Sequence, residues 1–159
     1  MTGFTIRTAA GAALAAGLAL SAPAAAQSLS DCDWRASAWL LAEPWEANSR
    51  TFANGDVRIA LIDAIEPAAG ALHLLVLSPP WDELGARQCR VLSLDGGIGF
   101  AGVDFAALEA WYDAAVGLLF ALPVSVYEPE TGAFADRMLD FNLNQATGAI
   151  EAYVGPMGE

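Results

Sequence analysis

Hydrophobic residues in this chain occur in short runs that are separated by turn-forming residues. Four segments share one pattern, an acidic or amide residue followed after three positions by glycine: 66–70, 113–117, 128–132 and 144–148. This pattern is typical of four-residue hairpin loops built on a type I turn, whose last position favours glycine because its φ is positive. Asn54-Gly55 predicts a fifth hairpin. The chain therefore reads as antiparallel strands joined by tight turns.

The loop at 128–132 predicts a register in which hydrophobic residues of the two flanking strands share one face. The expected pairs are Leu118 with Leu143, Phe120 with Phe141, and Leu122 with Leu139. The loop at 144–148 brings Ile150 and Val154 to that same face. Two turns placed independently thus agree on one hydrophobic face, as a correct antiparallel register requires.

The loops at 113–117 and 66–70 predict the cross-strand partners of one aromatic and one acidic residue. The same reasoning puts Trp111 opposite Phe120 and Asp63 opposite Leu74. A buried carboxylate at position 63 would need a hydrogen-bonding or arginine partner, or a raised pKa, as often occurs at functional sites. We expect Asp63 instead at the rim of the sheet, exposed or paired with Arg50 or Arg58, because charged side chains are rarely fully buried.

These patterns predict an all-β fold, an antiparallel meander of about eight or nine short strands. Segments such as 72–77 are hydrophobic on both faces, so both faces need to be covered, as they are in a small sandwich or barrel. Helical spacing of hydrophobic residues occurs only in 33–43. A tight turn at Gly96-Gly97 is expected to join strands at 91–95 and 98–105.

The first 26 residues match a secretory signal peptide. Arg7 precedes a hydrophobic stretch at 9–20, and Ala24-x-Ala26 provides a cleavage pattern. The hydrophobic stretch is shorter than the ~20 residues with which a helix crosses a bilayer, so the mature chain is not expected to span a membrane. We predict a single β-rich domain at 27–159 in the periplasm or the extracellular medium of a bacterium.

Cysteine usage and charge limit the function classes further. Cys32 and Cys89 are predicted to form a disulfide, because an even number of cysteines in an oxidising compartment favours pairing over metal binding. The net charge is −12, and loss of Arg7 with the signal peptide makes it −13, with no lysine in the chain. Such a charge repels phosphate backbones, so nucleic acid is not an expected partner. The acidic residues are expected instead to form a solvated surface that keeps the protein soluble.

The segment Leu92-Ser-Leu-Asp-Gly-Gly97 is similar to the Asp-Gly-Gly-Gly-x-Arg loop of patatin-like lipid acyl hydrolases, whose backbone N–H groups form an oxyanion hole. The resemblance covers a handful of residues, and Ile98 and Phe100 stand where that loop has its third glycine and its arginine. None of the mature serines lies in the Gly-x-Ser-x-Gly elbow that the nucleophile requires. We therefore assign this segment to a hairpin turn, with no catalytic role.

Four other residues are candidates for ligand binding. His73 is the single histidine and could act as a ligand or general base, although a histidine satisfied within the sheet is the expected role. Asp63 is the candidate carboxylate. Trp45 and Trp81 each stand beside proline and acidic residues, and they are the tryptophans expected to be exposed. No metal site and no cofactor is predicted.

The sequence favours a binding or interaction role over catalysis. One alternative is a carrier for a small ligand, with a cavity lined by aromatic and aliphatic side chains. The other is a carboxylate-dependent hydrolase centred on Asp63 or His73. The partner is expected to be a small molecule or another protein.

Overall fold

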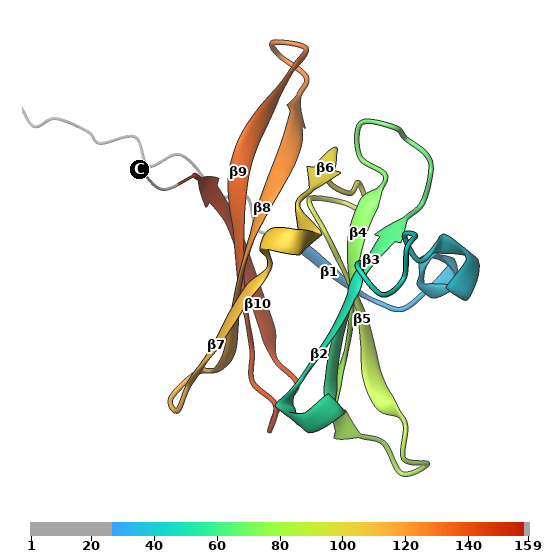
Figure 1. The fold of residues 1–159 in the computed structure, drawn as a ribbon, viewed down its shortest axis with the longest axis vertical. Coiled ribbons are helices and arrows are strands. Elements are labelled where there is room, and N and C mark those ends of the chain that lie inside the picture. Colours follow the sequence, from blue (N-terminus) through green and yellow to red (C-terminus); the bar gives the residue numbers. More distant parts are fainter. Residues whose placement is uncertain (1–26, 158–159) are drawn as a thin grey trace, which may run out of the picture.

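The predicted strands form two antiparallel sheets that pack face to face in a computed structural model that describes residues 27–157 (Figure 1). The first sheet has the order β1-β5-β4-β3-β2, with bounds Ser28–Asp31 (β1), Ser49–Phe52 (β2), Val57–Asp63 (β3), Leu72–Trp81 (β4) and Arg87–Ser93 (β5). The second has the order β10-β9-β8-β6, and β7 also pairs with β8. Its bounds are Gly102–Val103 (β6), Glu109–Asp113 (β7), Gly117–Glu128 (β8), Ala133–Leu143 (β9) and Ile150–Pro156 (β10). The all-β prediction is confirmed, as a two-sheet sandwich.

The ten strands are one or two more than the eight or nine expected, and the segment with helical spacing forms short turns. The segment 33–43 holds two 3₁₀ turns, η1 (Trp34–Ala36) and η2 (Ala38–Leu40). Figure 1 shows both on the side of the first sheet that faces away from the second. Further 3₁₀ turns are η3 (Ala53–Gly55) and η4 (Phe105–Ala107). The predicted signal peptide lies outside the described residues.

The register between β8, β9 and β10 agrees with the sequence prediction. Leu118, Phe120 and Leu122 pair with Leu143, Phe141 and Leu139, and Ile150 and Val154 pair with Leu143 and Leu139. Two other predicted pairs are wrong. Trp111 lies opposite Leu119, because the loop after β7 is one residue shorter than expected. Asp63 lies opposite Leu72, because the connection between Ala64 and Ala71 is two residues longer than the predicted four-residue loop.

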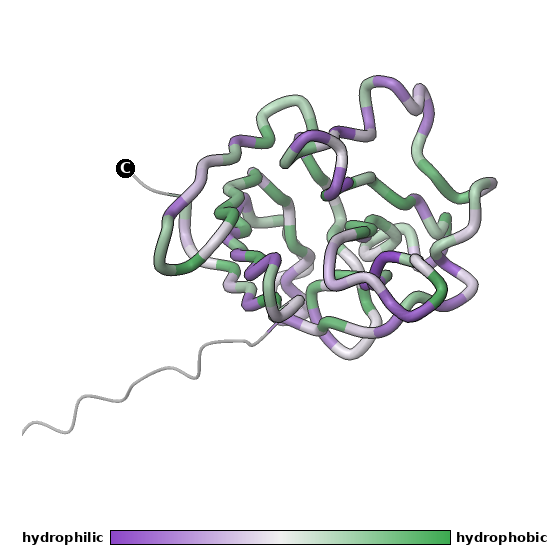
Figure 2. Tube along the Cα trace, turned by 90° about the horizontal axis from the view of Figure 1, so that it is seen from below, coloured by the Kyte–Doolittle hydropathy of each residue, from purple (hydrophilic) through white to green (hydrophobic). Residues whose placement is uncertain are grey.

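The main core lies between the two sheets and is filled by the inward residues of both. In Figure 2 hydrophobic and hydrophilic positions alternate along parts of the chain, the pattern that gives a strand one buried face. The rings of Phe120 and Phe141 stack with centroids 4.6 Å apart, and Phe52 meets Phe120 edge-on at 5.1 Å. Leu74, Val76 and Leu92 are fully buried in the same cluster. Burial of these side chains supplies most of the driving force for packing the sheets.

A second, smaller core lies on the outer face of the first sheet. Leu40 of η2 covers it, and the sheet contributes four buried residues: Ala60, Ile62, Leu75 and Val91. The disulfide between Cys32 and Cys89 packs against this cluster and joins the chain after β1 to β5, with the Cα atoms 5.3 Å apart. The predicted disulfide is therefore confirmed, and β4 has both faces covered, as its hydrophobic composition indicated.

The segment 92–97, which resembles the hydrolase loop, lies where the chain leaves the first sheet. Asp95 and Ile98 pair across a two-residue turn, in which Gly96 and Gly97 have φ of 50° and 89°. A long second strand does not follow: only 102–103 forms β6, in the second sheet. Gly99 is needed where the chain crosses, because a Cβ there would lie 2.2 Å from the carbonyl oxygen of Leu72. The segment is thus a hairpin tip and a crossing between sheets.

Candidate functional site

Asp63 lies exposed at the end of β3, as expected for the rim of the sheet. Its Oδ1 accepts a hydrogen bond from the N–H of Ile65 at 2.9 Å, which stabilises the turn that follows. The suggested partner Arg50 instead donates to the carbonyl oxygens of Ala106 and Leu108. The role of Asp63 in this structure is therefore to stabilise the turn after β3, and that role requires no ligand.

His73 is buried on the outer face of the first sheet, where it meets a serine that the sequence analysis did not pair with it. Its Nδ1 lies 2.8 Å from the Oγ of Ser93, and the two side chains are 2% and 1% exposed. The Ser93 Oγ also accepts a hydrogen bond from Nη1 of Arg35 at 3.2 Å. A hydroxyl has one proton and two acceptor lone pairs, so Ser93 can accept from Arg35 and also form a hydrogen bond with Nδ1 of His73 in either neutral tautomer of the imidazole.

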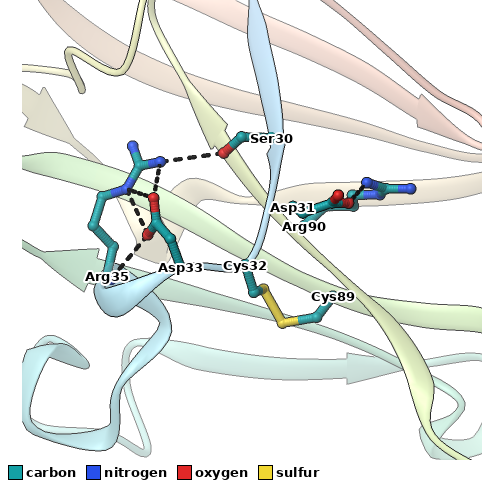
Figure 3. Close-up of a disulfide and its surroundings, with 7 residues drawn as sticks. All are labelled: Ser30, Asp31, Cys32, Asp33, Arg35, Cys89 and Arg90. Carbon is teal, nitrogen blue, oxygen red and sulfur yellow. Dashed lines mark hydrogen bonds and ion pairs between the residues drawn. A yellow bond between two sulfur atoms is a disulfide. The ribbon is translucent and has the colours of Figure 1, made fainter.

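Arg35 connects this pair to the segment before η1 (Figure 3). Its Nη2 lies 2.7 Å from Oδ2 of Asp33 and also donates to Oγ of Ser30, while its Nε donates to the same carboxylate. The Asp33 carboxylate in turn accepts the backbone N–H of Arg35 and caps η1. The fork geometry of the guanidinium thus joins η1, β1 and β5 beside the disulfide.

The electrostatics of this network keep the histidine neutral. Burial lowers the pKa of His73 to about 4, and the positive charge of Arg35 acts in the same direction. The hydrogen bond from Arg35 holds the pKa of the Asp33 carboxyl below its ordinary value. The Asp33–Arg35 pair therefore stays charged at neutral pH beside an uncharged imidazole.

Ser93 and His73 have the residue types of a catalytic nucleophile and its general base, but Ser93 is not accessible to a substrate as a nucleophile has to be. A nucleophile has to reach its substrate, whereas Ser93 is 1% exposed and its oxygen already accepts a hydrogen bond from Arg35. The arrangement is that of a buried polar network, in which each group satisfies the next. It holds the N-terminal segment on the first sheet.

Trp45 and Trp81 are exposed as predicted, at 53% and 52%, but different elements position them. Trp45 lies in the loop before β2, beside Glu43, Pro44 and Glu46 in a shallow depression. Trp81 ends β4, and its ring lies under the guanidinium of Arg87, with 5.8 Å between Cζ and the ring centroid. The ring face of Trp81 on that side is therefore already occupied.

A groove on the outer face of the second sheet is the stronger candidate for a binding site. We call it the Trp111–Tyr153 groove, after the exposed aromatic side chains of β7 and β10 that line it. Its volume is about 390 Å³, within the range of small-molecule sites. The other outward side chains that line it are Leu119, Asp140, Asn142 and Glu151.

The strand register explains why these side chains meet. Residues 118, 120 and 122 of β8 belong to the core, so Leu119 between them faces outward. Leu119 pairs with Trp111 on one side and with Asn142 on the other, and Asn142 pairs with Glu151. One row of side chains therefore runs across four strands, and Asp140 and Tyr153 pair in the next row.

Two contacts fix the end of the groove formed by β10. The backbone N–H of Glu151 donates to Oδ1 of Asn142 at 3.0 Å, and the Asn142 amide donates to the Glu151 carboxylate at 3.4 Å. The ring of Tyr153 lies over Gly155, where a Cβ would come within 2.6 Å of the ring carbon Cε1. The absence of a side chain at Gly155 thus permits the observed position of the ring.

Sequence reasoning missed both Ser93 and this groove for the same reason. Each depends on which residues face each other across strands: no turn pattern aligned β5 with β4, and the alignment predicted for β7 was wrong by one residue. Within 27–157 no helix is both long and hydrophobic enough to cross a bilayer. Comparison with known proteins finds no matching family model, no similar curated protein and no similar solved structure.

Proposed function

We propose that this protein is an exported bacterial domain with a binding role, located in the periplasm or secreted, and that its ligand occupies the Trp111–Tyr153 groove. The observation that carries the proposal is the groove itself, in which two half-exposed aromatic side chains flank a hydrophobic floor and polar side chains. Flat aromatic rings with polar neighbours are common in sites that bind small molecules. The Cys32–Cys89 disulfide supports export, because such bonds persist in oxidising compartments.

The positions of the tryptophans favour a surface site over an internal carrier cavity. All five are between 48% and 74% exposed, so none contributes a fully enclosed wall. The space between the sheets is occupied by close-packed residues such as Phe120, Leu122 and Leu139. A ligand would therefore bind on the face of the sandwich rather than between its sheets.

Native mass spectrometry of the protein purified from its own bacterium would test the proposal. A bound small molecule is expected on the wild type and on a Trp39→Ala/Trp45→Ala control, which removes two exposed tryptophans elsewhere. It is expected to be lost from a Trp111→Ala/Tyr153→Ala variant. If the same species remains bound after both groove rings are removed, the groove is not the binding site.

A further inference from the structure

The outer face of the second sheet is negatively charged, with no basic side chain to compensate. Its outward positions carry five carboxylates, which are Glu109, Asp113, Asp136, Asp140 and Glu151. In the described strands β7 to β10 the only basic residue is Arg137. It lies opposite the buried Val124, on the core side, and its Nη2 binds Glu128 Oε1 at 2.6 Å. The electrostatic potential over this face therefore attracts cations.

Two of these carboxylates line the Trp111–Tyr153 groove, and both are available to a ligand. Asp140 has no hydrogen-bond or ion-pair partner among residues 27–157. Glu151 is oriented by Asn142, which contacts only one of its two carboxylate oxygens. Both carboxylates come from adjacent strands, in neighbouring rows of the sheet. They can accept hydrogen bonds from donors spaced along one ligand.

The aromatic side chains define the length of that ligand. Trp111 and Tyr153 are 48% and 49% exposed and stand on β7 and β10, which are three strand spacings apart. At ~4.8 Å per spacing, the two strands are about 14 Å apart. Between the two rings the floor is formed by Leu119 and by residues 120, 141 and 152, whose side chains point into the core. The groove thus has hydrophobic surface along its length and carboxylates beside it.

We propose that the occupant of the Trp111–Tyr153 groove is a linear aliphatic polyamine; this inference rests on the proposed function and names its ligand class. Methylene segments would contact Leu119 and the sheet, and ammonium groups would bind Asp140 and Glu151. The ring faces of Trp111 and Tyr153 attract the same cations. The charged side chains on the outward positions of β7 to β10 are all carboxylates, and charge complementarity with them favours this ligand over an anionic or neutral one.

The shape of the groove and its small number of carboxylates favour an extended cation over a metal ion. Within the described part of the chain, no group of three or more His, Cys, Asp or Glu side chains is arranged to hold a metal ion. A divalent metal needs several oxygen ligands around one point, whereas the groove supplies only Asp140 and Glu151, which stand in neighbouring rows of β9 and β10. The volume of about 390 Å³ suits a small molecule and is too small for a protein segment of more than a few residues.

Isothermal titration with spermidine at low ionic strength would test the inference on the full mature protein. Binding is expected to the wild type and to weaken by about tenfold or more in Trp111→Ala and in Asp140→Asn/Glu151→Gln. Trp39→Ala and Asp136→Asn are the matched controls, an exposed tryptophan and an outward carboxylate outside the groove, and they should bind as the wild type does. Thermal unfolding of each variant verifies the fold, and Trp111→Phe is the milder substitution if Trp111→Ala is unstable.

Further probes decide between possible occupants of the groove. Triethylene glycol, a neutral chain, should not bind, and Mg²⁺ at equal ionic strength should not displace spermidine selectively. Affinity should fall as salt is raised, because screening weakens exposed ion pairs. Spermidine binding that is equal in all variants, or displaced equally well by Mg²⁺, would show a nonspecific acidic surface and overturn the inference. If a neutral oligosaccharide or a basic peptide binds in a Trp111-dependent manner while spermidine does not, the ligand class is wrong but the proposed function stands.

Discussion

The hydroxyl of Ser93 lies 2.8 Å from Nδ1 of His73, and the two residues come from adjacent strands of the first sheet. Arg35 donates to the same hydroxyl, so the ion pair of the buried Arg35 with Asp33 is connected through Ser93 to a neutral imidazole. This network is the polar counterpart of the disulfide, since both attach the N-terminal segment to β5. Its charges give it a measurable dependence on pH.

We expect the free energy of unfolding to fall by about 3 kcal/mol between pH 7 and pH 4 because of His73. Its pKa is lowered from 6.5 to about 4 by burial and by Arg35, so the unfolded chain binds a proton at a higher pH than the folded chain does. Stability is therefore lost as the pH falls through this window. Guanidinium unfolding at several pH values measures it.

His73→Asn is the control for that experiment, because it removes the titration and keeps a hydrogen-bonding side chain. Its stability should vary less between pH 7 and pH 4 than that of the wild type. The lowered pKa of Asp33 acts in a separate window, below its ordinary value of 3.8, where the carboxylate begins to be protonated in the unfolded chain. An equally steep decrease in both proteins above pH 4 would contradict the assignment to His73.

Replacing Arg35 by methionine is expected to cost about 3 kcal/mol of stability. The substitution keeps most of the side-chain volume but removes the guanidinium that pairs with Asp33 and donates to the buried Ser93. Arg58→Met, at an exposed position on β3, is the matched control and should change stability by less than about 0.5 kcal/mol. Equal unfolding midpoints for the two variants would sink this account of the network.

Removing the disulfide by Cys32→Ala/Cys89→Ala is expected to lower the free energy of unfolding by about 4 kcal/mol. The bond closes a loop with a sequence separation of 57, which restricts the unfolded chain. Denaturation of the oxidised, reduced and substituted proteins measures the effect. The reduced and substituted forms should agree with each other, and a stability equal to that of the oxidised form would refute the expectation.

Gly97→Val should destabilise the turn before the crossing by about 1–2 kcal/mol, whereas Gly96→Asn should be nearly neutral. Gly97 has φ of 89°, and a β-branched residue adopts positive φ at a steric cost. Gly96 has φ of 50°, and asparagine is favoured at the first position of such a two-residue turn. Thermal unfolding separates the two variants, and the reverse order of stability would argue against this turn geometry.

The sequence predicted best the parts of the fold that depend on one local loop. The loop at 128–132 has the expected length, so the pairs between β8 and β9 follow directly from it. The loop after Asp113 is shorter, because Gly117 itself pairs with Asp113, and Trp111 therefore meets Leu119. In the β3–β4 connection, the backbone N–H of Ala64 donates to the carbonyl oxygen of Ala71, and Ile65 after it has a positive φ. Asp63 therefore pairs two positions away from the predicted partner. A change of one or two residues in a loop moves every pair that follows it.

The candidate sites were harder to predict because they combine distant parts of the chain. His73 was a candidate because it is the single histidine, but Ser93, which contacts it, and Arg35, which contacts Ser93, lie 20 and 38 residues away from it in the chain. Trp111 and Tyr153 were assembled into one groove only by three successive strand pairings. Hydrophobic alternation predicts that a side chain faces outward, but it does not show which outward side chains become neighbours.

The position of the disulfide also has a mechanical consequence. Strands β2, β3 and β4 lie wholly inside the covalent loop between Cys32 and Cys89. When the two ends of the domain are pulled apart, tension passes through the sulfur atoms and cannot lengthen that loop. At ~3.4 Å per residue, the bond withholds roughly 190 Å of contour length, which a reducing agent would release in a single-molecule pulling experiment.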